Sequence, residues 1–152
     1  MGDGETLTSG DQVECVITVL AQRDLEYLVF EDMKPAGFEA AKDRSGDTLE
    51  VRRVTAPGGA PGSPAGVSNW PVSGQMEVRD NKVAFFITRL PAGTWEIHYE
   101  LRAEVPGDYH VLPTSGYPMY NPGIRGNSAE MRIRVQDKVA KAPSSSDSPL
   151  RN

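Results

Sequence analysis

The sequence predicts an all-β protein, a two-sheet antiparallel β-sandwich of about seven short strands. The clearest signal is Thr94 to Val105, in which apolar residues alternate with polar ones without a break, as in a strand with one dry and one wet face. Turn signals separate several such segments, and no segment shows a convincing helical period. This pattern favours packed sheets over helices.

A tight turn precedes the clearest strand. Leu90 to Gly93 reads Leu-Pro-Ala-Gly, in which proline presets φ at the second turn position and glycine suits the fourth. The apolar segment Val83 to Thr88 comes before this turn. We therefore expect the two segments to form a long hairpin at the centre of the domain.

The other expected strands follow from the same period of two. Glu26 to Asp32 is almost continuously apolar at its centre, which is typical of a central strand covered on both faces. Asp80 and Asn81 suit a short hairpin loop between Gln75 to Arg79 and Lys82 to Leu90, and the second of these ranges contains the apolar segment Val83 to Thr88. The remaining candidates are Val13 to Ala21, Leu49 to Val54 as the weakest, and Met131 to Gln136.

The chain divides into a central domain and two tails. Residues 12–137 hold the predicted strands, with a Pro/Gly-rich insertion at 56–74. Residues 1–11 are polar and acidic, and we expect a flexible N-terminal tail there. Residues 138–152 carry a run rich in serine and proline, which predicts a disordered C-terminal tail.

Composition narrows the classes of partner. The net charge is −5, whereas nucleic-acid binders concentrate lysine and arginine to displace counterions, so we expect no nucleic-acid partner. No apolar run approaches the roughly 20 residues of a membrane helix. The first ten residues lack the basic and apolar regions of a secretory signal. The single cysteine, Cys15, can form neither an internal disulfide nor a cysteine zinc site.

An ordered series of short motifs resembles a known family. Turns rich in Pro-Ala-Gly and Pro-Gly are common, so the specificity lies in their order and spacing from Val13 to Val135. The series is Tyr27 to Asp32, Pro35 to Glu39, Arg79-Asp80, Phe85-Phe86, Leu90 to Thr94, Tyr99, Arg102-Ala103, Pro106-Gly107, His110-Val111, Pro113, Met119 to Pro122 and Arg125-Gly126. It resembles the C-terminal macroglobulin-like domain of bacterial alpha-2-macroglobulins.

The resemblance implies a non-catalytic domain of a large protease trap, an endopeptidase inhibitor. In that family a protease cuts a bait segment, the molecule rearranges, and an internal thioester in another domain can couple to the attacker. The terminal domain packs near the thioester domain and shields the thioester. Partners would then be other domains of the parent, with target proteases reached only through it, and the location would be periplasmic, cell-envelope or extracellular.

The thioester chemistry itself is not in this chain. The family motif is Cys-x-Glu-Gln, whereas Cys15 is followed by Val16, Ile17 and Thr18, and we find no bait region. Two segments depart from the family pattern: the insertion is longer than expected, and Ser115 to Pro118 is less charged.

The sharpest predicted site is the segment from Tyr117 to Gly126. It combines Tyr117, Met119 and Tyr120 with turn-forming prolines and ends near Arg125, so it offers rigid aromatic and adaptable thioether groups at low entropic cost. We predict that these four residues form an interdomain interface. The alternative is that Met119 and Tyr120 only cap one end of the sandwich.

A second class of function combines this loop with another residue. Trp70 follows the Pro/Gly-rich stretch and is the candidate exposed anchor for a sugar or partner. The alternative reading is therefore a free-standing immunoglobulin-like adhesion or carbohydrate-binding module that uses Trp70 and the loop around Tyr120. The other reading of Trp70 is closure of its loop onto the sandwich.

The remaining polar groups predict no catalytic, cofactor or metal site. Cys15 lies on an apolar strand face, which predicts an inert thiol. His98 shares a wet face with Glu96 and Glu100, which favours ion pairing over metal binding. The loop from Asp43 to Glu50 fails the calcium-loop register. We therefore expect that the protein is not an enzyme.

Overall fold

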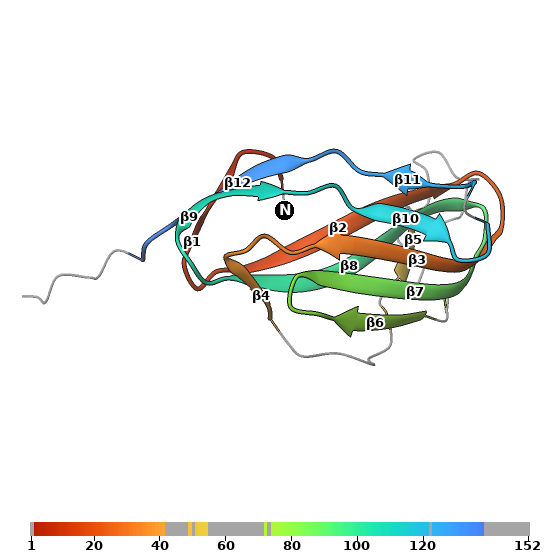
Figure 1. Ribbon diagram of the computed structural model, residues 1–152, viewed down its shortest axis with the longest axis horizontal. Coiled ribbons are helices and arrows are strands. Elements are labelled where there is room, and N and C mark those ends of the chain that lie inside the picture. Colours follow the sequence, from red (N-terminus) through yellow and green to blue (C-terminus); the bar gives the residue numbers. More distant parts are fainter. Residues whose placement is uncertain are drawn as a thin grey trace, which may run out of the picture.

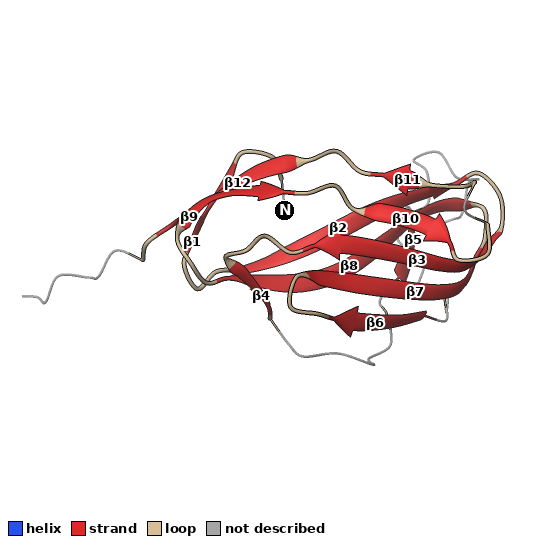
Figure 2. Ribbon diagram, viewed as in Figure 1, coloured by secondary structure: helices blue, strands red, loops and turns tan. Residues whose placement is uncertain are grey.

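The computed structural model of the protein describes residues 2–41, 49, 51–54, 72, 74–121 and 123–138. These residues form strands and connecting loops without a helix (Figures 1 and 2). The strands are β1(Glu5–Thr8), β2(Gln12–Ala21), β3(Leu25–Met33), β4(Phe38–Ala40), β5(Val51–Val54), β6(Gly74–Val78), β7(Lys82–Leu90), β8(Gly93–Ala103), β9(Gly107–Val111), β10(Ser115–Pro118), β11(Gly126–Asn127) and β12(Met131–Gln136). The predicted all-β class is confirmed.

Two main sheets form the sandwich. One has five strands in the order β11-β10-β3-β7-β6, and the other has four strands, with β8 between β2 on one side and β4 and β5 on the other. A smaller sheet, β1-β12-β9, extends one end of the molecule (Figure 1). β3 lies inside the five-stranded sheet, which confirms the central position predicted from its apolar run.

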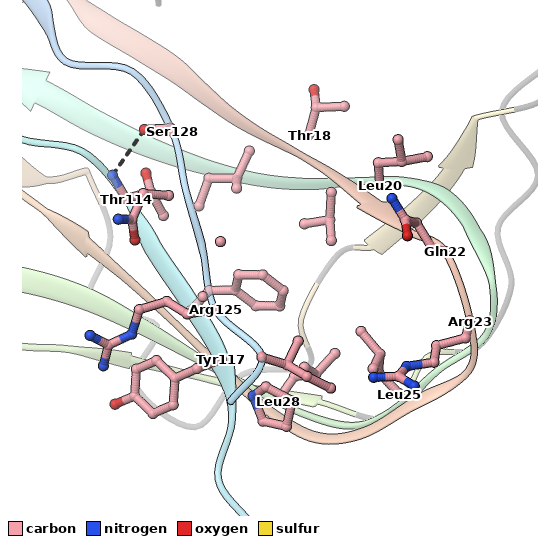
Figure 3. Close-up of a pocket in the computed structure, with 18 residues that line it drawn as sticks. Thr18, Leu20, Gln22, Arg23, Leu25, Leu28, Thr114, Tyr117, Arg125 and Ser128 are labelled. Atoms are coloured by element: carbon pink, nitrogen blue, oxygen red, sulfur yellow. Dashed lines mark hydrogen bonds between the residues drawn. The ribbon is translucent and has the colours of Figure 1, made fainter. Parts of the chain in front are cut away.

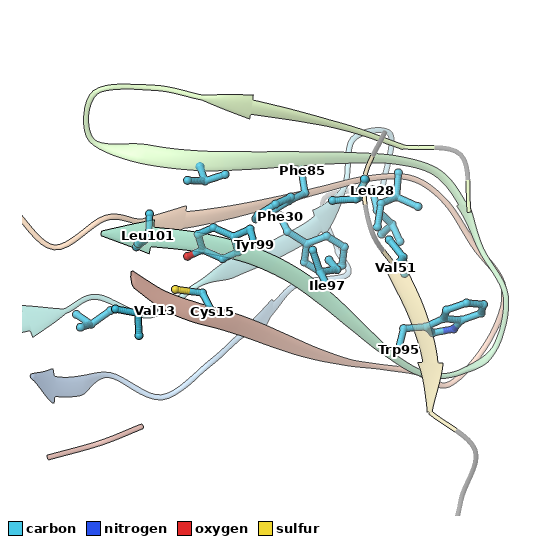
Figure 4. Packing of buried hydrophobic residues seen from close by; sticks show 14 of the residues in the cluster. Val13, Cys15, Leu28, Phe30, Val51, Phe85, Trp95, Ile97, Tyr99 and Leu101 are labelled. Carbon is cyan, nitrogen blue, oxygen red and sulfur yellow. The ribbon is translucent and has the colours of Figure 1, made fainter. Parts of the chain in front are cut away.

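The core lies between the two main sheets (Figure 4). Along β8, the side chains of Trp95, Ile97, Tyr99 and Leu101 are buried, whereas Glu100 and Arg102 are exposed, as the alternation predicts. The Phe85 ring of the opposite sheet lies 5.2 Å from the Tyr99 ring. Burial of such large apolar side chains is the main stabilising contribution in a sandwich of this kind.

The prediction that Val83 to Thr88 and Thr94 to Val105 form a long central hairpin is wrong. β7 pairs with β3 and β6, whereas β8 pairs with β2, β4 and β5, so the turn from Leu90 to Gly93 carries the chain from one sheet to the other. Both strands have an apolar face, and these faces meet across the core instead of the strands pairing edge to edge. Gly93 has φ 142°, a conformation that L side chains rarely adopt.

The shorter hairpin is confirmed. β6 and β7 pair antiparallel up to Val78 and Val83, and the Arg79 amide donates to the Lys82 carbonyl at 2.8 Å. Asp80 and Asn81 lie at the tip, as their tolerance of turn conformations predicts.

The prediction of a flexible tail at residues 1–11 is also wrong, because this segment contains β1. β1 pairs in parallel with β12, from Glu5 opposite Ile133 to Thr8 opposite Gln136, and Leu7 packs against the core. The Gly10 amide donates to the Ala103 carbonyl at 2.7 Å. A polar composition does not reveal a strand whose partner lies at the other end of the chain.

The strands expected from the sequence did not include β10 and β11, which lie in a segment rich in proline and glycine from Pro106 to Asn127. Aromatic side chains lie against two glycines, Gly116 of β10 and Gly37 before β4. A Cβ on Gly116 would lie 2.6 Å from the Phe30 ring, and one on Gly37 would lie 2.1 Å from the Tyr109 hydroxyl. These glycines therefore permit close packing of strands, whereas the sequence suggested loops.

Several predictions fall outside the described residues. They concern Trp70, the Asp43 to Glu50 loop apart from Leu49, the C-terminal tail after residue 138 and most of the 56–74 insertion, although Gly74 already begins β6. Within the described residues, no helix has the length and apolar character needed to cross a membrane.

Candidate functional site

Three of the four predicted interface residues lie at the C-terminal end of β10. Tyr117 is in the strand, and Met119 and Tyr120 come directly after it. This strand pairs with β3, so that Tyr117 lies opposite Val29 and Pro118 opposite Leu28. Two turns follow: the Asn121 amide donates to the Pro118 carbonyl at 3.3 Å, and the Ile124 amide donates to the Asn121 carbonyl at 3.2 Å. We call residues 117–121 and 123–125 the aromatic loop.

The tip of the aromatic loop exposes large apolar groups. Met119 is 52% exposed and Tyr120 is 78% exposed. The Tyr120 ring contacts the ring of Tyr27 edge-on, with 5.3 Å between the centroids. The Met119 amide also donates to the Tyr27 carbonyl at 2.8 Å. The tip is therefore held against β3 by one backbone hydrogen bond and one ring contact.

Tyr27 has an unusual backbone conformation. Its φ is 52°, in the left-handed region, and among the described residues it is the only one other than glycine with a positive φ. A side chain in this region is disfavoured by roughly 1 to 3 kcal/mol and persists where the surroundings require it. The sequence analysis assigned Tyr27 no role, because no local motif predicts this conformation.

Tyr117 and Arg125 belong to a different part of the loop. The Arg125 guanidinium lies 5.4 Å from the centre of the Tyr117 ring, and the Tyr117 hydroxyl donates to Glu31 at 3.3 Å. Glu31 also accepts from Lys82 at 2.5 Å, and this contact lowers the pKa of Glu31 below its usual value. Tyr117 and Arg125 thus anchor the loop, while Met119 and Tyr120 remain open to contact.

The aromatic loop is rich in apolar and aromatic groups. Residues 117–125 include no His, Cys, Ser, Asp or Glu, so the loop supplies no imidazole, thiol or carboxylate group. It supplies two aromatic rings and a thioether, groups that bind other proteins through apolar contact.

His98 lies between two glutamates on the outer face of the four-stranded sheet. Its Nδ1 lies 2.8 Å from Glu14 of β2 and its Nε2 lies 3.2 Å from Glu96. The sequence analysis expected Glu96 and Glu100 as neighbours, and the structure brings in Glu14 because β2 pairs with β8. The hydrogen bond from His98 lowers the pKa of Glu14. Within the described residues, no group of His, Cys, Asp and Glu is arranged to hold a metal ion.

A buried polar network crosses the core near Cys15. The Tyr99 hydroxyl donates to Asp32, and the Thr114 hydroxyl donates to the other oxygen of Asp32 at 2.8 Å. Burial raises the pKa of Asp32 and raises that of the Cys15 thiol to about 12. Cys15 is buried in the core, as its place on an apolar strand face predicts, and its raised pKa disfavours the reactive thiolate. That the thiol is inert stays a prediction.

Comparisons with known proteins identify the family. Residues 1–123 match the family model described as the bacterial alpha-2-macroglobulin MG10 domain. The alpha-2-macroglobulin homolog of Nostoc is 26% identical in a match that covers 88% of this chain and 6% of that protein. The alpha-2-macroglobulin of Xylella fastidiosa is 27% identical in a match that covers 79% of this chain and 7% of that protein. The chain therefore spans only a small part of the length of these relatives.

Solved structures agree with the family model. Salmonella alpha-2-macroglobulin reacted with methylamine is 25% identical, with a TM-score of 0.61 over 86% of this chain and 8% of that one. An Escherichia coli alpha-2-macroglobulin fragment from domain MG7 to the C-terminus has a TM-score of 0.60 at 22% identity, over 86% of this chain and 20% of that one, which supports the fold. The chain belongs to the bacterial alpha-2-macroglobulin MG10 domain family.

Proposed function

We propose that this chain is a non-catalytic domain of a bacterial alpha-2-macroglobulin that traps proteases, and that its aromatic loop packs against another domain of the same polypeptide. The observation that carries the proposal is the pair of exposed side chains, Met119 and Tyr120, held in place by Tyr27 at the cost of an unfavourable φ. A strained support for an exposed tip is typical of a contact site.

The proposed partner is the thioester domain of the parent. A thioester is destroyed by water and by small amines, so it survives only where side chains exclude both. The Tyr120 ring and the Met119 thioether are apolar groups of suitable size to cover such a bond. The chain spans only 6% and 7% of the length of the two relatives, which supports a larger parent protein.

A protease trap acts where foreign proteases are met. We therefore place the parent in the periplasm, the cell envelope or outside the cell. An antibody against this chain, used on a denaturing gel of source cells, should detect a band many times larger than 16.5 kDa. A band at 16.5 kDa would contradict the larger parent.

The shielding role is tested in the full-length parent with Met119→Ala and Tyr120→Ala, separately and combined. We expect faster release of a free thiol by methylamine before any protease is added, and weaker capture of protease on native gels. Val105→Ala is the matched control, because Val105 is 55% exposed and lies outside the aromatic loop. Unchanged thiol release and unchanged capture in the double variant would overturn the proposal.

The second function class, a carbohydrate-binding module, uses Trp70 and the loop around Tyr120. Trp70 lies outside the described part of the chain, and no observation on the described residues favours a sugar site.

A further inference from the structure

β2 is an edge strand with an unusually apolar sequence. It pairs with β8 on one side, and no strand of the described residues pairs with its other side. The seven residues from Cys15 to Ala21 contain no charge, proline or glycine. Soluble proteins usually protect an exposed edge with charges, proline or a bulge, because free backbone groups otherwise recruit another strand. Leu20 is 70% exposed and Val16 is 42% exposed on this strand.

An open groove of about 800 Å³ runs beside the uncharged half of β2. In Figure 3, Thr18, Leu20 and Gln22 lie on one side of the groove, and Tyr117 and Arg125 lie on the other. The Leu28 and Phe30 side chains of β3 form part of the lining. The groove therefore lies where the two main sheets separate at one edge of the sandwich.

Burial along β2 shows that this part of the core is incompletely covered. On the inner face of the strand, Val13, Cys15 and Ala21 are buried, but Ile17 and Val19 are only half-buried. Both half-buried residues line the groove. An aliphatic side chain entering the groove would complete the cover over them and remove further apolar surface from water.

The charge of the groove is opposite in sign to that of the whole chain. Its lining includes Arg23 and Arg125 and no aspartate or glutamate, although the chain has a net charge of −5. Arg125 stacks on Tyr117, whereas Arg23 makes no ion pair with any described residue and lies just beyond the end of β2. A carboxylate at this end of the groove would therefore find a cation.

We propose that this groove binds an extended peptide segment of another polypeptide. The segment adds an antiparallel strand to the free edge of β2, inserts an aliphatic side chain against Ile17 and Val19, and directs an acidic residue near its N-terminal end to Arg23. Main-chain hydrogen bonds supply affinity in this mode, and the groove and the arginine supply specificity. The groove shares Tyr117 and Arg125 with the aromatic loop, but its lining includes neither Met119 nor Tyr120. The inference therefore does not rest on the shielding role proposed for those two residues.

The test uses the 152-residue chain and a fluorescent peptide of about seven residues, the length that spans one edge strand. The peptide begins with two glutamates and continues with alternating valine and threonine. Two control peptides have lysines in place of the glutamates or N-methyl groups on alternate amides. We expect the first peptide to bind and both controls to bind at least about tenfold more weakly.

Charge exchange makes the test specific. Arg23→Glu should weaken binding of the glutamate peptide by about tenfold and strengthen binding of the lysine peptide. Leu20→Glu should also weaken binding of the glutamate peptide. Val105→Glu is the matched control, because Val105 is exposed but does not line the groove. All three residues are exposed, so the unfolding midpoints should stay near that of the parent chain.

Hydrogen exchange locates the bound strand. The peptide should slow exchange of amides in β2, and protection confined to β6, an edge of the five-stranded sheet, would overturn the proposal. The proposal would also be overturned if neither the Arg23→Glu change nor the N-methyl groups altered the affinity for the peptide. A chain that sediments as a dimer and becomes monomeric on Leu20→Glu would show that a second copy occupies the edge instead.

Discussion

The ring of Tyr27 in β3 meets the ring of Tyr120 edge-on, with an angle of 81° between their planes. Tyr27 also accepts a hydrogen bond from the Met119 amide, so the strand fixes both the backbone and the side chain of the aromatic loop at its tip. Tyr27 makes both contacts from a left-handed backbone, with a φ of 52°. These contacts restrain the exposed Tyr120 ring, and such restraint would lower the entropy lost on binding the domain proposed to pack there.

The ring contact should be measurable as a coupling free energy. In a double-mutant cycle, Tyr27→Ala and Tyr120→Ala should be coupled by about 0.5 to 1 kcal/mol in the free energy of unfolding, because edge-on aromatic pairs contribute in that range. Urea unfolding of the four proteins gives the value. A parallel cycle with Tyr27→Ala and Val105→Ala should give no coupling, and equal coupling in both cycles would contradict the contact.

Gly116 should be intolerant of a side chain. A Cβ there would lie 2.6 Å from two atoms of the Phe30 ring, so Gly116→Ala forces the ring or the strand to shift and should lower the free energy of unfolding by about 1 to 3 kcal/mol. Gly126→Ala is the matched control, since nothing lies within 4 Å of its added Cβ. We expect that change to stay within about 0.5 kcal/mol in urea unfolding.

Asp32 should make a distinctive contribution to the pH dependence of stability. Burial raises its pKa, so the folded state holds the proton more tightly than the unfolded state, whose pKa is near the ordinary 3.8. The stabilising contribution is complete below that ordinary value and is lost as the pH rises through the raised pKa of the folded state.

Asp32→Asn isolates this contribution, because asparagine does not titrate. The difference in free energy of unfolding, parent minus Asp32→Asn, should fall as the pH rises from the ordinary pKa through the raised one and then become constant. Carboxyls with lowered pKa values, such as Glu14 and Glu31, act in the opposite direction but cancel in the difference. Parallel stability curves for the two proteins would show that Asp32 has an ordinary pKa.

The Cys15 thiol should react only when the protein opens. It is 3% exposed and its pKa is raised to about 12, so at pH 8 almost no thiolate is available to a reagent. We expect negligible labelling by iodoacetamide in buffer and complete labelling in denaturing urea, measured as a mass shift. Rapid labelling of the folded chain would mean that β2 opens readily.

The sequence predicted the strand elements that carry their own signal. β8 alternates apolar and polar residues, β2 has apolar residues at every second position from Val13 to Ala21, and β3 has a continuous apolar centre. The existence of these strands and the all-β class therefore follow from local pattern. The aromatic loop could also be predicted, because exposed rings and turn-forming prolines are adjacent in the chain. That it binds another domain stays a prediction.

Only the tertiary structure decided which strands are neighbours. A period of two says that β7 and β8 each have an apolar face, but it does not say whether they pair at their edges or pack face to face, and they pack face to face. β1 and β12 lie at opposite ends of the chain, and Tyr27 meets Tyr120 across 93 residues, the difference of their numbers. Local sequence fixes the propensity and the faces of a strand, whereas partners, edges and strained residues depend on contacts between segments that are remote in the chain.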